Sequence, residues 1–119
     1  MRKFLLHAVL AVVLVTAADA RVKVIGRGDN LKFDPDSIPA NLRVTFELMS
    51  KKCIKCHTME RTVIAVLTGK APITGQPFDR QAVKTYGIKM LRKPDSDMSK
   101  QQIRDVVVLL NYLLEENAK

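Results

Sequence analysis

The 119-residue sequence contains few of the side chains that bind metals or form cross-links: it has two cysteines and two histidines. Both cysteines, Cys53 and Cys56, belong to one short segment, so none stands at position 21 to carry a lipid anchor. A structural zinc site usually takes four Cys or His ligands. The chain offers only three, because His7 lies in a segment that we predict to be removed. A disulfide between Cys53 and Cys56 would close a very short and strained loop.

Aromatic and acidic residues are also scarce. Aromatic residues make up 5% of the chain, and 20 Lys and Arg stand against 12 Asp and Glu, which gives a formal net charge of +8. A basic surface can attract nucleic acid, but no aromatic platform on which bases could stack accompanies this charge. We therefore predict no nucleic-acid partner. The length allows one small domain, and the sequence shows neither an internal repeat nor a low-complexity tract.

The N-terminal segment has the pattern of a secretory signal peptide. Arg2-Lys3 precede an apolar run over residues 8–18, and Ala18-Asp19-Ala20 has the small-x-small form of a cleavage site. The apolar run is too short to span a bilayer comfortably. We predict a cleaved signal over residues 1–20 and a mature chain from Arg21 without an integral membrane anchor. The protein is then exported, with a bacterial periplasm as the favoured compartment.

The segment Cys53-Ile54-Lys55-Cys56-His57 has the Cys-x-x-Cys-His spacing of c-type haem attachment. Two cysteines about one helical turn apart can each form a thioether with a vinyl group of the same porphyrin. His57 follows directly and is the expected proximal iron ligand. A thioredoxin-like dithiol would need a strand before the first cysteine, and residues 47–52 are polar and helix-like. The spacing predicts one covalent haem c held by Cys53, Cys56 and His57.

An extended arm over residues 21–36, with at most one short strand, is predicted before a helical domain over residues 37–119. The arm carries turn signals and a weak alternation of apolar residues. We expect these apolar side chains to cover the helical domain rather than to form a separate unit. They are Val22, Val24, Leu31 and Phe33.

Four helices are expected in that domain. Asp36 or Ser37 caps the first helix, with Pro39 in its first turn, and the helix leads to Cys53 at the haem.

A second helix after His57 ends at Gly69, although its β-branched run also allows a strand. Asp79 caps a third helix to about Arg92, in which Gly87 indicates close packing that the approach of a flat ring would explain. Ser99 and Gln102 form a capping box for the last helix, whose apolar stripe should pack on the first helix. The stripe comprises Ile103, Val106, Val107, Leu110, Leu113 and Leu114.

The distal side of the iron needs a different kind of ligand, because His57 is the only histidine of the mature chain. Methionine, a rarer ligand such as lysine, or an open position are the possibilities. Met59 lies too close to His57 in sequence, and Met49 is expected in the core. Met90 is our preferred distal ligand, with Met98 as the alternative.

These features resemble the class I c-type cytochromes, and in particular the small bacterial members with one haem. The likeness covers about residues 37–117 and depends mainly on the Cys53–His57 segment. The segment Met90-Leu91-Arg92-Lys93-Pro94 is similar to the family's Met-Pro-x-x-Pro but lacks the first proline, and Tyr112-Leu113 matches a Tyr-Leu pair in the last helix. The resemblance implies an all-α fold wrapped around one haem and one-electron transfer between redox partners.

An iron with two protein ligands has no free position for a substrate, so an electron carrier is expected rather than an enzyme. Cations near both ligand segments could steer a redox partner with an acidic docking surface. They are Lys51, Lys52, Lys55, Lys89, Arg92 and Lys93. The alternatives are a five-coordinate haem sensor or peroxidase-like protein, and a haem subunit of a larger oxidase or dehydrogenase complex.

Overall fold

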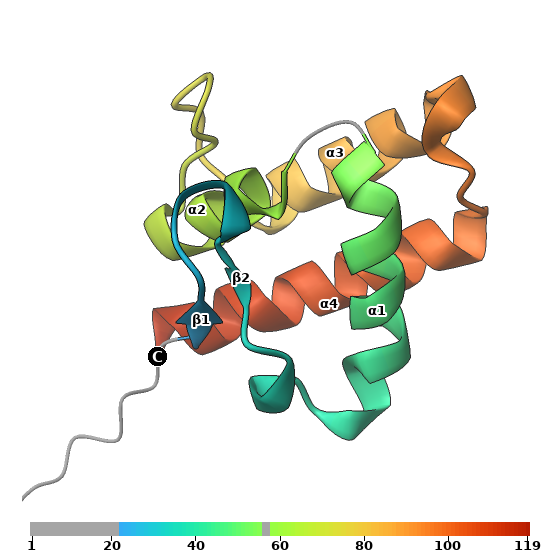
Figure 1. The fold of residues 1–119 in the computed structure, drawn as a ribbon. Helices are drawn as coiled ribbons and strands as arrows, with labels where there is room; N and C mark the ends of the chain where they lie inside the picture. The colour runs from blue at the N-terminus through green and yellow to red at the C-terminus, as the bar shows by residue number, and fades with distance from the viewer. Residues whose placement is uncertain (1–21, 56–57) are drawn as a thin grey trace, which may run out of the picture.

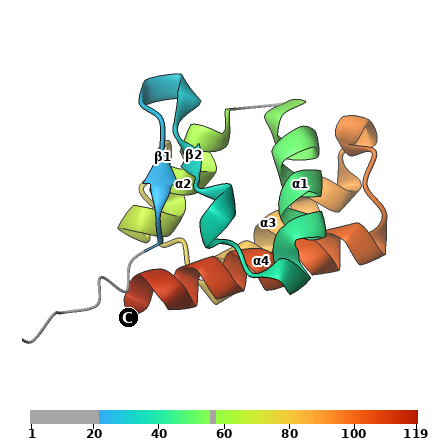
Figure 2. The same cartoon turned by 60° about the horizontal axis from the view of Figure 1, so that its bottom comes forward.

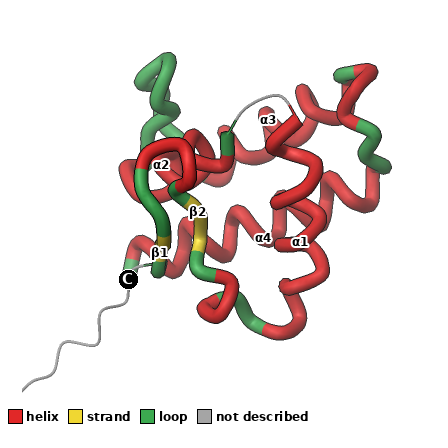
Figure 3. Tube along the Cα trace, in the orientation of Figure 1, coloured by secondary structure: helices red, strands yellow, loops and turns green. Residues whose placement is uncertain are grey.

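A computed structural model describes residues 22–55 and 58–119. These residues form four α-helices, five 3-10 helices of one turn each and one two-stranded sheet, so the described part of the chain is mostly helical, as predicted (Figures 1 and 3). Among these residues no helix is both long enough and apolar enough to cross a bilayer. The predicted signal peptide lies outside the described residues.

The four helices are α1 (Arg43–Lys52), α2 (Met59–Thr68), α3 (Arg80–Arg92) and α4 (Lys100–Ala118). Helix α4 packs against each of the other three. Helix α3 lies beside α4, whereas α1 crosses it steeply (Figures 1 and 2). The prediction that the last helix packs on the helix leading to Cys53 is therefore confirmed.

The N-terminal arm is a hairpin rather than a single extended segment. Its strands, β1 (Val24–Ile25) and β2 (Lys32–Phe33), pair antiparallel with Val24 opposite Phe33. Gly26 has a φ of +83°, and a Cβ there would lie 2.2 Å from the Asn30 carbonyl oxygen, so the turn requires glycine. Phe33 is completely buried in the core that the helices share, and the other apolar residues of the arm pack against that core, as predicted.

The first helix begins later than predicted. Two 3-10 turns, Pro35–Ser37 and Ala40–Leu42, precede α1, and the carboxylate of Asp34 caps the first of them by accepting from the Asp36 N–H at 3.0 Å. Pro39 disfavours helical geometry in the residue before it, and Ile38 is extended, with φ −84° and ψ 127°. Neither Asp36 nor Ser37 therefore caps α1.

The other predicted boundaries are confirmed. Gly69, with a φ of +69°, ends α2 in the left-handed conformation, so the run before it is helix and not strand. The Asp79 carboxylate accepts from the Ala82 N–H at 2.9 Å and caps α3. Ser99 and Gln102 form the capping box of α4, with both hydrogen bonds present.

The core is widest along α4. Ile103, Val106, Leu110 and Leu113 of the predicted stripe are buried, and Leu109, which the stripe omits, is completely buried as well. An apolar stripe is the pattern expected of a helix that is covered on one side. Because α4 is covered by three other helices, its buried arc is broader than a single stripe.

Gly87 is closely packed, as predicted, and the neighbour that the structure shows is a helix. A Cβ at this position would lie 2.9 Å from Cγ2 of Val107 and 3.3 Å from Cγ2 of Ile103. Both neighbours belong to α4. The missing side chain therefore allows α3 and α4 to approach closely, and the expected approach of a flat ring stays a prediction.

Candidate functional site

A cavity of about 390 Å³ lies among α1, α2, α3 and the loop that joins α2 to α3. This volume falls within the range of about 300–1,000 Å³ that is usual for small-molecule and cofactor sites. Its wall is mostly apolar, and helix α4 contributes two core residues to it, Val106 and Leu110. The apolar lining consists of Met49, Ala65, Ala71, Pro72, Ile73, Phe78, Met90, Met98, Val106 and Leu110.

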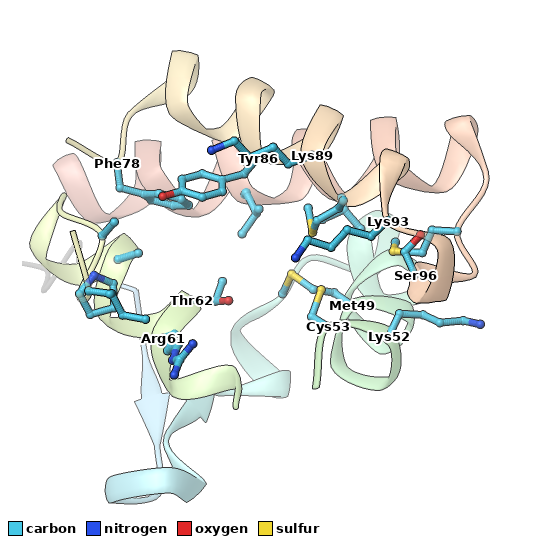
Figure 4. Close-up of a pocket in the computed structure, with 18 of the residues that line it drawn as sticks. Met49, Lys52, Cys53, Arg61, Thr62, Phe78, Tyr86, Lys89, Lys93 and Ser96 are labelled. Carbon is cyan, nitrogen blue, oxygen red and sulfur yellow. The ribbon is translucent and has the colours of Figure 1, made fainter. Parts of the chain in front are cut away.

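Two sulfur-containing side chains form the wall at the end of α1. Met49 is completely buried, and Cys53 follows one turn later in the 3-10 turn Cys53–Lys55, its N–H donating to the Met49 carbonyl oxygen. Figure 4 shows both sulfur atoms facing the cavity. Phe46, Met49 and Cys53 recur every three or four positions, so they lie on one face of the helix. The helix thus delivers Cys53 to the cavity.

Two aromatic rings form the facing wall. Phe78 and Tyr86 pack with their ring centroids 5.8 Å apart, across the cavity from Thr62 of α2 (Figure 4). Neither ring is among the site residues predicted from the sequence. A signal for Phe78 does exist: it directly precedes the N-cap Asp79, where an apolar residue commonly packs on the first turns of the helix.

Both candidate distal methionines line this cavity. Met90 comes from the last turn of α3 and Met98 from the segment just before α4, and each is half-buried. Met59 is buried in the core away from the cavity lining. The fold therefore brings Cys53 together with Met90 and Met98 and leaves the choice between the two thioethers open.

Positive charge dominates the polar part of the lining. Lys52, Lys89 and Lys93 of the predicted docking set line the cavity, and Arg61 of α2, which was not predicted, joins them. Among the described residues, Asp95 is the one carboxylate in the lining. Nothing in the sequence pattern distinguishes Arg61 from other surface cations.

Two further members of the predicted docking set lie outside the cavity lining. Lys51 and Arg92 are exposed but outside the lining. The side chain of Lys55 is not among those the structure describes.

Cys56 and His57 lie outside the described residues, so their predicted haem contacts stay predictions. Pro72, from the loop that joins α2 to α3, lines the cavity. Within residues 22–55 and 58–119, no group of three His, Cys, Asp or Glu side chains could hold a metal ion. A site for iron would therefore depend on the Cys53–His57 segment.

No family model, curated protein or solved structure matches this chain.

Proposed function

We propose that the protein is an exported c-type cytochrome that carries single electrons with one covalent haem. The observation that carries this proposal is the position of Cys53, the first cysteine of the Cys-x-x-Cys-His motif. Its sulfur faces an apolar cavity of about 390 Å³ that is also lined by the thioethers of Met90 and Met98. A lone motif can arise by chance. A motif that opens onto a cofactor-sized cavity containing soft sulfur donors is a more specific arrangement.

The described residues fit a flat apolar ring. Phe78 and Tyr86 provide an aromatic wall, and Met49 and Cys53 provide another. Val106 and Leu110 of α4 add apolar side chains to the lining. Cations at the cavity suit the anionic side groups of a haem.

In this proposal each residue of the site has a separate role. Cys53 and Cys56 would bond the ring, His57 would be the proximal iron ligand, and Met90 the distal one. Bound haem supplies the reversible one-electron chemistry, and the chain sets its burial and its access to partners. Thioether ligation favours the reduced state and raises the potential.

The basic rim supports a redox partner with an acidic docking surface. Lys52, Lys89, Lys93 and Arg61 gather around one cavity, whereas acidic lining is limited to Asp95 among the described residues. The positive electrostatic field of these side chains increases the rate of association with an acidic protein and makes that rate fall as the salt concentration rises.

Visible spectra of the protein, produced in a host with haem-attachment machinery, test the proposal. We expect a covalently bound haem with sharp bands in the reduced state and no reaction with carbon monoxide. Carbon monoxide binding to the native reduced protein would instead favour a five-coordinate sensor or peroxidase-like protein. Copurification with a large oxidase or dehydrogenase at low salt, and release at high salt, would favour the subunit alternative.

A further inference from the structure

Lys93 differs from the other cations of the cavity. Lys52 has its Nζ 2.6 Å from the Asp97 carboxylate and points out of the cavity, and the Nζ of Lys89 lies over the Tyr86 ring, 5.4 Å from its centroid (Figure 4). Lys93 instead extends into the cavity, toward Met49 and Cys53 (Figure 4). Within the described residues, no carboxylate forms an ion pair with it.

The backbone fixes this position. Lys93 ends α3, and its N–H donates to the Met90 carbonyl oxygen at 3.2 Å. The following Pro94 disfavours helical geometry at Lys93, whose φ of −76° and ψ of 126° are extended. The chain therefore leaves the helix axis at this residue. Lys93 is exposed as a residue, so its ammonium keeps contact with water.

We infer that Lys93 raises the reduction potential of the group bound in this cavity, an inference that rests on the proposed haem. Reduction lowers the positive charge of an iron centre by one. A fixed cation nearby therefore stabilises the reduced state relative to the oxidised state. The effect is larger beside an apolar wall than in bulk water, because the surroundings screen the interaction less. Lys93 thus acts on the potential through its charge and without binding the iron itself.

A redox titration of the holoprotein against a mediator tests this inference. Lys93→Gln should lower the equilibrium constant for reduction about tenfold, which corresponds to about 59 mV for a one-electron couple. Lys93→Arg should stay within about twofold of the original protein because it retains the charge. Lys84→Gln is the matched control: Lys84 is exposed on α3 and does not line the cavity. The same loss of charge there should change the constant by less than about twofold.

Three results would overturn the inference. Lys93→Gln could shift the equilibrium constant for reduction no more than Lys84→Gln does. Lys93→Arg could lower it as much as Lys93→Gln, which would show that charge is not the cause. Lys93→Gln could also abolish the sulfur-to-iron absorption band, which would place Lys93 in the support of the iron ligand. A protein without haem would refute the proposed function itself, and its lack of any visible spectrum distinguishes that outcome.

Discussion

The Nζ of Lys52 lies 2.6 Å from the Asp97 carboxylate and links the last turn of α1 to the segment before α4. Lys52 directly precedes Cys53, and Asp97 directly precedes Met98, so the pair joins the two walls that carry these sulfur atoms. Asp97 has a φ of +50°, the only positive φ of a non-glycine residue in the described part of the chain. Aspartate and asparagine tolerate this left-handed conformation better than most residues.

A double-mutant cycle with Lys52→Gln and Asp97→Asn should give a coupling free energy below about 1 kcal/mol, decreasing with salt, when unfolding is followed in urea. The side chain of Asp97 is 75% exposed, and water therefore screens the pair although Lys52 is only 23% exposed. The Arg80–Glu115 pair between α3 and α4, exposed on both sides, is the matched control. A coupling of several kcal/mol would contradict this estimate.

Gly87→Ala should destabilise the protein by about 1 kcal/mol even though alanine is the better helix former. Alanine gains up to about 1 kcal/mol of helix propensity, but its Cβ would overlap Val107 Cγ2, and overpacking a tight contact costs about 1–3 kcal/mol. Thermal unfolding measures the change. Adding Val107→Ala should remove the penalty of the alanine at 87. A double variant that shows purely additive losses would refute the contact explanation.

Asn117 ties the end of α4 to the end of α2. Its Nδ2 donates to the Val66 and Leu67 carbonyl oxygens at 3.2 and 3.3 Å. Asn117→Ala should cost about 1 kcal/mol of unfolding free energy. Asn117→Asp should cost more, because a carboxylate would face two carbonyl oxygens at the negative end of α2. Urea unfolding gives the order, with exposed Asn41→Ala as control; an aspartate variant as stable as the original would contradict the role of this contact.

Met90→Ala should abolish the sulfur-to-iron absorption band near the red end of the oxidised spectrum and make the reduced protein react with carbon monoxide. The reason is that Met90 is the proposed distal ligand, and alanine offers no donor. Met98→Ala is the matched control, since Met98 lines the same cavity. Loss of the band in Met98→Ala with its retention in Met90→Ala would transfer the ligand role to Met98.

Local signals in the sequence predicted most of the helices. The capping residues Asp79 and Ser99 and the terminating Gly69 act through their immediate neighbours, so their effects can be read without knowing the fold. The predicted start of α1 is wrong because the prediction places Pro39 in the first turn of the helix. Pro39 instead keeps the backbone of Ile38, the residue before it, extended.

The walls of the site were harder to predict because they depend on tertiary contacts. Cys53 and Met90 were identified by chemistry, since sulfur and spacing mark them. Arg61 and Tyr86 line the cavity only because α2 and α3 face each other. Gly87 shows the same limit: the sequence indicated close packing, but only the fold shows that the close neighbours are on α4.

The mass of the purified protein, from a host able to attach haem, tests the central claim most directly. The account predicts a coloured protein whose mass equals the chain from Arg21 plus one haem, and loss of that added mass when Cys53 and Cys56 are both replaced by alanine. A colourless protein with the mass of the bare polypeptide would contradict it.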